Sequence, residues 1–189
     1  MNAPWDPGRA LVALSLIVLA ANSVGAAGGP GLQGPGASSV DRGRYLVSIT
    51  GCHDCHSPKV GEMPDPERPL SGRPSTTQLP SKMEGEVHAS LDLTAWTGPW
   101  GQSVASNLTP DPATGLATRY DEAKFIQTMR TGKKPSGLQL LPPMPSAVYQ
   151  NLTDEDLKAI YAYLRSLKPI RNAVLTGIPT AAAPVPGKR

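Results

Sequence analysis

Apolar residues recur every three or four positions in three separate stretches of the chain, which is the spacing that gathers them on one face of an α-helix. The first stretch is 40–49, and the residues that share its apolar face are Val40, Tyr45, Leu46 and Ile49. Gly43 lies within this stretch and would allow a second helix to cross closely. The pattern predicts a short amphipathic helix over 40–49.

Two further helices are predicted in the second half of the chain. Asp121 is a suitable N-cap for a helix over 121–131, and Gly132 is a stop signal after it. Thr153 is a suitable N-cap for a helix over 154–168. The buried stripe of this last helix is formed by Leu157, Ile160, Tyr161, Leu164 and Leu167.

The stretch 58–118 is rich in proline and glycine and has no sustained apolar period, so we expect an ordered wrap rather than a second domain. The whole chain has 19 glycines and 21 prolines among 189 residues, and 39% of its residues are hydrophobic. Such a chain is loop-rich, with a modest core that needs a staple or a cofactor. The formal net charge of +3 is too small to indicate a nucleic-acid partner.

The N-terminus has the pattern of a secretory signal peptide. Residues 10–21, ALVALSLIVLAA, are apolar or small, and this run is shorter than the roughly 20 residues needed to span a bilayer. Small residues follow it, which predicts a signal peptide over 1–26 with cleavage near Ala26 or Ala27. Without cleavage the segment would be an anchor at the membrane face. Either way the following domain is exported.

Three further segments complete the predicted organisation. Residues 27–39 are rich in Gly, Pro and Ser and should form a flexible linker. The folded domain is predicted over 40–170. Residues 171–189 form an Ala/Pro-rich basic tail, which we expect to be disordered.

Both cysteines and two of the three histidines lie in the short sequence TGCHDCHSP, residues 50–58. A disulfide between Cys52 and Cys55 would close only a tiny loop and add little stability. A thioredoxin-like redox pair needs a βαβ context that the sequence does not indicate. A zinc site would need more ligands, for which His88 is the one remaining histidine.

The remaining interpretation is covalent haem, because Cys52-x-x-Cys55-His56 is the attachment motif C-x-x-C-H. Two thiols three positions apart on a helical turn can each bond one haem vinyl group. The imidazole of His56 then faces the iron from the same side. Export agrees with this interpretation, and we therefore expect one covalent haem c.

The sixth iron ligand has five candidates: Met63, Met83, His88, Met129 and Met144. Met129 fits the apolar face of the helix over 121–131, and Met63 and Met83 lie in polar, proline-rich loops. Met144 lies in LLPPMPS, where three prolines exclude a helix and stiffen the loop while two leucines provide apolar cover. A stiff apolar loop suits a thioether ligand, so Met144 is the favoured candidate. Trp100 is expected either to pack on the porphyrin and donate its N–H to a propionate, or to be a core residue.

Five stretches of the chain resemble the haem modules of bacterial exported class I c-type cytochromes, in particular those of alcohol and sugar dehydrogenase cytochrome subunits. These stretches are RGRYLVSITGCHDCHSP, GPWGQSVASNLTPDPATGL, FIQTMRTGK, LLPPMPS and LTDEDLKAIYAYLRSLKPI. The resemblance implies an all-α class I fold in which the first and last helices cross near the haem. It also implies thioether anchors at Cys52 and Cys55 and iron ligands at His56 and Met144. Two departures are the single haem motif and Ser146, where relatives often have an aromatic residue.

From the residues and the resemblance together we expect a periplasmic one-electron carrier with His/Met ligation, and not an enzyme. Its partners would be redox proteins, either a dehydrogenase donor or a respiratory acceptor. One alternative is an electron-transfer subunit that stays attached to a dehydrogenase, for which Lys133 and Lys134 would form a docking pair. The other is a haem enzyme or sensor with an open iron site.

Overall fold

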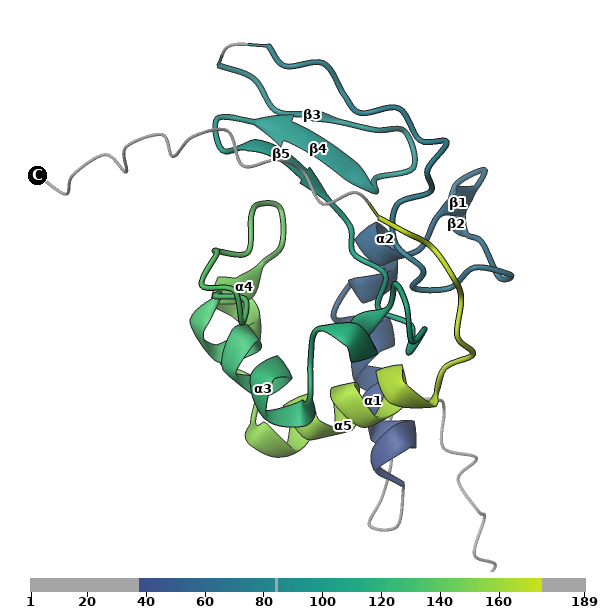
Figure 1. Cartoon of the computed structure of the whole chain (residues 1–189), viewed down its shortest axis with the longest axis vertical. Coiled ribbons are helices and arrows are strands. Elements are labelled where there is room, and N and C mark those ends of the chain that lie inside the picture. Colours follow the sequence, from purple (N-terminus) through teal and green to yellow (C-terminus); the bar gives the residue numbers. More distant parts are fainter. Residues whose placement is uncertain (1–37, 84, 175–189) are drawn as a thin grey trace, which may run out of the picture.

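The computed structural model describes residues 38–83 and 85–174. The predicted signal peptide, most of the linker and the tail from residue 175 on lie outside this range. A group of helices forms one end of the domain, and a small antiparallel sheet forms the other (Figure 1). The first and last long helices lie across one another in the helical part, and a loop of the chain rises from this part toward the sheet.

The three predicted helices are all present. They are α1 (Ser39–Ile49), α3 (Glu122–Thr131) and α5 (Asp154–Ser166). Asp121 and Thr153 are their predicted N-caps, and each side chain accepts a hydrogen bond from a backbone N–H in the first turn. Gly132 ends α3 in the left-handed conformation, which favours glycine.

The packing of α1 against α5 forms much of the core. Leu46 and Val47 of α1 and Leu157, Ile160 and Leu164 of α5 are buried in one hydrophobic cluster. The predicted apolar face of α1 is wrong at Ile49, whose side chain is 59% exposed. The helix turns Gly43, Leu46 and Val47 toward α5 instead, because the close approach at Gly43 fixes which face meets α5.

Five short strands contradict the all-α prediction. Strands β1 (Lys59–Val60) and β2 (Met63–Pro64) form a small hairpin. Strands β3 (His88–Ala89), β4 (Ala95–Gly98) and β5 (Gly101–Val104) form an antiparallel sheet in the order β3-β4-β5. None exceeds four residues, which is too short for an alternating pattern to stand out in a sequence rich in proline and glycine.

Three short helical segments complete the described structure: α2 (Cys52–His56), η1 (Leu116–Thr118) and α4 (Ser146–Tyr149). The ordered chain also continues past the predicted domain end at 170. Asn172 is buried, and its side-chain amide donates hydrogen bonds to the backbone oxygens of Ser71 and Arg73 at 2.7 and 2.9 Å. The first residues of the expected tail are therefore packed against the domain.

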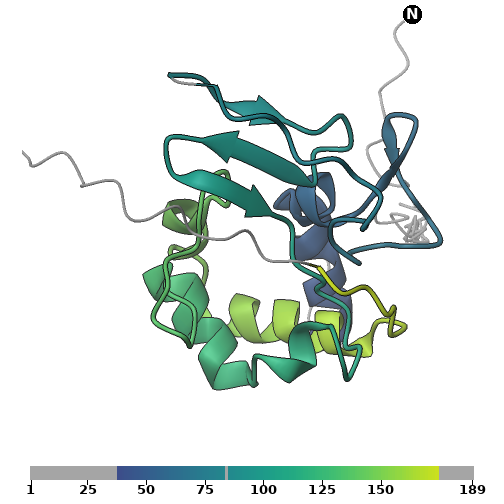
Figure 2. The ribbon, with the colours of Figure 1, turned by 45° about the horizontal axis from the view of Figure 1, so that its top comes forward.

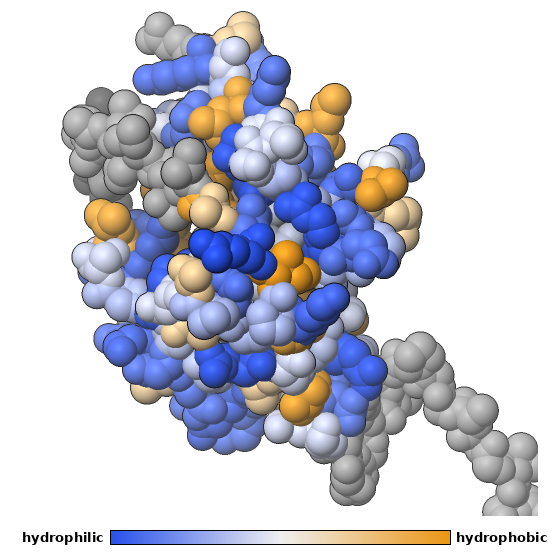
Figure 3. Space-filling model, turned by 45° about the vertical axis from the view of Figure 1, so that its right-hand side comes forward, coloured by the Kyte–Doolittle hydropathy of each residue, from blue (hydrophilic) through white to orange (hydrophobic). Residues whose placement is uncertain are grey.

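Figure 3 shows one face of the molecule, on which apolar residues lie in small separate groups among hydrophilic ones. Within residues 38–83 and 85–174, no helix has the length and apolar character needed to cross a membrane.

Candidate functional site

The cysteine motif forms a helix of its own because of one glycine. Thr50 ends α1, and Gly51 adopts a left-handed conformation with φ 78°, so the chain turns at once into α2. The N–H of Asp54 then donates to the Gly51 oxygen at 3.1 Å. The one-turn helix brings Cys52 and Cys55, three positions apart, to the same side.

Both thiols line a cavity in the domain that has a volume of about 360 Å³ and a predominantly apolar lining. Burial raises the pKa of Cys52 and of Cys55, so both are protonated thiols at neutral pH. They are not joined as a disulfide in the structure. Within the described residues, no group of three His, Cys, Asp or Glu side chains is arranged to hold a metal ion.

His56 lies in the same cavity wall, and its ring is held by one hydrogen bond. Its Nδ1 lies 2.8 Å from the backbone oxygen of Ser106, an acceptor that requires the proton on Nδ1. The other ring nitrogen, Nε2, therefore carries the lone pair. Burial lowers the pKa of His56, which keeps the imidazole neutral. A neutral imidazole with an oriented Nε2 is ready to ligate a metal.

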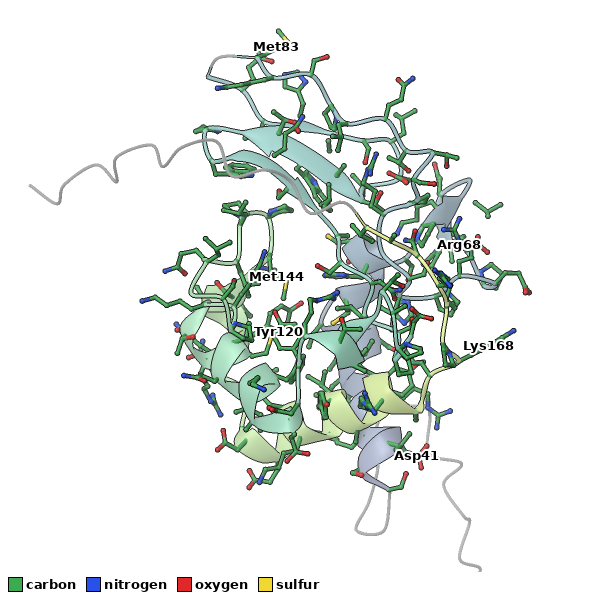
Figure 4. The ribbon with its side chains drawn as sticks, viewed as in Figure 1. Asp41, Arg68, Met83, Tyr120, Met144 and Lys168 are labelled. Atoms are coloured by element: carbon green, nitrogen blue, oxygen red, sulfur yellow. The ribbon has the colours of Figure 1, made fainter. Side chains whose placement is uncertain are left out.

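Met144 reaches the cavity from the side opposite α2. It belongs to the loop 133–145 between α3 and α4, which we call the distal loop. Met144 lines the cavity, is half-buried and packs against the hydrophobic core. Figure 4 shows its side chain directed from this loop toward the centre of the domain, above Tyr120. The cavity thus has a thiol and imidazole wall facing a thioether.

The other candidates for an iron ligand differ in their position relative to the cavity. Met63 and Met83 are 71% and 50% exposed, and neither lines the cavity. His88 also lies outside the lining, and its Nε2 is 2.8 Å from a carboxylate oxygen of Glu86. Met129 is buried in the core, as its helical spacing predicts, but it lines the cavity as well. A test of iron ligation by Met144 must therefore include a variant of Met129.

Trp100 does not occupy the place expected for a porphyrin contact. It is absent from the cavity lining, and its Nε1–H donates to Ser103 Oγ at 3.2 Å. Trp96 of β4 lines the cavity instead and is buried. The geometry therefore gives no support to the predicted contact between Trp100 and a propionate.

Sequence reasoning missed two tyrosines in the cavity wall. Tyr149 of α4 is buried, and its hydroxyl donates to the Thr50 oxygen at 2.6 Å, which ties α4 to the end of α1. Tyr120 lines the cavity just before α3, and burial raises its pKa. Both lie outside long periodic segments, so no sequence signal separated them from ordinary core or loop tyrosines.

Two cationic side chains in the lining were also missed. Arg119 and Lys134 both face the cavity, and neither takes part in an ion pair with a carboxylate among the described residues. Burial lowers the pKa of each, and the charge of Arg119 lowers the pKa of Lys134 further. This arrangement suits an anionic ligand. It also separates the predicted docking pair, because Lys133 is exposed while Lys134 turns inward.

Comparisons with curated proteins give three informative relatives. A nicotinate dehydrogenase subunit of Pseudomonas putida is 30% identical over 142 residues, which cover 75% of this chain and 10% of that protein. The fructose dehydrogenase cytochrome subunit of Gluconobacter japonicus is 31% identical over 133 residues, or 70% of this chain and 22% of that protein. A diheme cytochrome c-type protein of Cereibacter sphaeroides is 32% identical over 148 residues, or 76% of this chain and 41% of that protein.

The chain thus spans less than a quarter of the length of either of these dehydrogenase subunits. The matched part coincides with the domain that carries the cavity, since the family model of cytochrome c covers residues 40–168. The chain therefore belongs to the cytochrome c family.

Proposed function

We propose that this protein is an exported one-electron carrier with a single covalent haem c. The family itself implies electron transfer through covalently bound haem. The observation that supports the assignment of individual haem-binding residues is the two-sided cavity, in which Cys52, Cys55 and His56 face Met144. In this assignment the two cysteines would be the thioether anchors, and His56 and Met144 would ligate the iron.

The lining of the cavity fits the chemistry of a haem. Its lining is mainly apolar, as a porphyrin ring requires, and its thiols stand on one helical turn as the two vinyl groups require. A haem also carries two anionic propionates. Arg119 and Lys134 are the cavity cations free of protein carboxylates in the described structure, so they are the groups that would receive them.

When bound, the haem supplies an iron that stores and releases one electron. The protein residues would hold the two iron ligands in the same positions in both oxidation states. The hydrogen bond from His56 Nδ1–H to the Ser106 oxygen fixes the imidazole plane. Pro142, Pro143 and Pro145 restrict the backbone on both sides of Met144. The apolar walls exclude water. This exclusion and the thioether ligand would together favour a high reduction potential of the haem.

We further propose that residues 1–26 direct export to the periplasm, with 27–39 as a linker to the haem domain. The partners in this proposal are redox proteins, a dehydrogenase donor or a respiratory acceptor. A second candidate is stable membership of a dehydrogenase complex, favoured by the dehydrogenase subunits among the relatives. Gel filtration of the natively extracted protein separates the two, because a free carrier elutes at its monomer size.

The experiment that tests the carrier function is the visible spectrum of the purified full chain in both oxidation states. We expect haem that stays with the chain through acidic acetone extraction, and a far-red absorption band in the oxidised state that marks sulfur ligation. We also expect one-electron redox behaviour and poor binding of carbon monoxide by the reduced protein. Extraction of the colour into the solvent, or fast carbon monoxide binding without the far-red band, would overturn the proposal in favour of an open-site haem protein.

A further inference from the structure

We infer that Ser103 of β5 is a positioning residue that holds the distal loop, and thereby Met144, in place, and that Trp100 holds Ser103. This inference rests on the proposed iron ligation by Met144. The sequence did not predict the three-stranded sheet, and this inference gives the sheet a role, because Ser103 belongs to its strand β5.

One hydroxyl connects the sheet to the distal loop. Ser103 is 9% exposed and lines the cavity beside Pro142. Its Oγ–H donates to the backbone oxygen of Pro142, two residues before Met144. The same oxygen atom of Ser103 accepts the Nε1–H of Trp100 at 3.2 Å. The hydroxyl of Ser103 thus accepts one hydrogen bond from Trp100 and uses its only proton to donate to the distal loop.

The position of Trp100 depends on the hairpin between β4 and β5. Gly98 and Gly101 are paired at the end of this hairpin, with Pro99 and Trp100 between them. A Cβ at Gly98 would lie 2.6 Å from ring atoms of Trp100, so the indole lies directly over this glycine. The ring therefore cannot be displaced toward β4, and its N–H stays directed at Ser103. Figures 1 and 2 both show the distal loop rising toward this end of the sheet.

The distal loop has few other attachments. Pro142, Pro143 and Pro145 have no N–H to donate. Among the described residues, the remaining backbone hydrogen bonds of 140–145 join them only to one another, to Gly132 or to α4. The bond from Ser103 is the one that ties this segment to a distant part of the chain. A loop that loses it should release Met144 from the iron more often, although its fold is kept by the prolines.

The test is the rate at which imidazole binds the oxidised full-length holoprotein, because an external ligand can enter only when Met144 leaves. Ser103→Ala should raise this rate about three- to tenfold, the range expected for the loss of one hydrogen bond. Ser103→Thr keeps the hydroxyl and should restore the parent rate. Gln102→Ala is the matched control, since Gln102 also lines the cavity from β5 but makes no hydrogen bond to the loop.

A second variant keeps the inference testable if Ser103→Ala does not fold. Trp100→Phe removes the indole N–H together with part of the ring system but leaves Ser103 and its bond to the loop in place, so it should raise the imidazole rate by a smaller factor. The unfolding midpoint in denaturant is measured for each variant. A lower midpoint with an unchanged imidazole rate would mean that Ser103 serves stability alone, and the inference would be wrong.

The result also separates this inference from the proposed function. Fast imidazole binding by the parent protein, with no far-red sulfur band, would overturn ligation by Met144 and the inference with it. A parent protein that shows the band and binds imidazole slowly, with Ser103→Ala behaving identically, would overturn the role of Ser103 only.

Discussion

Gly43 of α1 lies directly against the backbone of Ala159 in α5, and no side chain fits between the two helices at this point. A Cβ built on Gly43 would lie 1.9 Å from the Ala159 oxygen and 2.7 Å from Cβ of Tyr163. The ion pair of Arg42 with Asp156, 2.9 Å between Nη2 and Oδ1, joins the same two helices nearby. The crossing supports the cavity, because Ile160 and Leu164 of α5 belong to its lining.

This crossing predicts that Gly43→Ala destabilises the protein by about 3 kcal/mol, the upper part of the range for overpacking. At an open helical position the same change would stabilise by up to about 1 kcal/mol, so the sign of the effect is decisive. Ser48→Ala on the exposed side of α1 is the control and should change stability by less than about 0.5 kcal/mol. Equilibrium unfolding in denaturant measures both, and a stabilised Gly43→Ala protein would contradict the helix crossing.

Replacing Met144 should open the iron. In Met144→Ala we expect loss of the far-red sulfur band, rapid binding of carbon monoxide by the reduced protein and a lower reduction potential, because a thioether favours ferrous iron. Met129→Leu is the demanding control, since Met129 also lines the cavity, and Met63→Ala is the exposed control. Loss of the band in Met129→Leu, with Met144→Ala unaffected, would move the ligand to α3.

The two adjacent lysines provide a matched pair for the propionate site. Lys134→Met should lower the reduction potential by roughly 10–40 mV, because a cation near the haem favours the reduced state by up to about 1 kcal/mol when partly solvated. Lys133→Met removes the same charge from an exposed position and should have the smaller effect. Potentiometric titration of both variants makes the comparison, and equal shifts would argue against a specific role for Lys134.

Asp111 should contribute to the dependence of stability on pH. The hydroxyl of Thr114 and the backbone N–H groups of Thr114 and Ala113 donate to its carboxylate and lower its pKa. Since the pKa is lowered by folding, the contribution is complete above the unfolded value of about 4 and is lost as pH falls through the folded value. Asp111→Asn should therefore be less stable than the parent at pH 7, with a difference that shrinks in acid. Unfolding curves at several pH values measure this difference. A difference in stability that does not change with pH would contradict the prediction.

Export predicts a mature chain that starts near Ala27. The intact mass of protein taken from the periplasmic fraction would show the new N-terminus. Recovery of the chain from the membrane fraction, with Met1 retained, would establish the anchor interpretation instead.

The sequence by itself determined the local chemistry of this protein. Helix periodicity and caps such as Asp121 and Thr153 act over one or two turns, so the long helices could be predicted from neighbouring residues. The haem motif is local in the same sense, because five consecutive residues place two thiols and an imidazole together. The proline-framed Met144 was a sound candidate for the facing position, since stiffness and apolar cover are also local properties.

Only the tertiary structure decided which distant residues meet around the cavity. The strands are at most four residues long, which is too short for an alternating pattern to reveal them. Lys133 and Lys134 look alike in sequence, but the turn after α3 points one to solvent and the other inward. Trp96 lines the cavity in place of the predicted Trp100, because the β4–β5 hairpin turns Trp100 over Gly98 and toward Ser103. These outcomes depend on contacts between residues far apart in the sequence, such as Ser103 and Pro142, which are separated by 39 positions. Rules that use only neighbouring residues cannot predict such contacts.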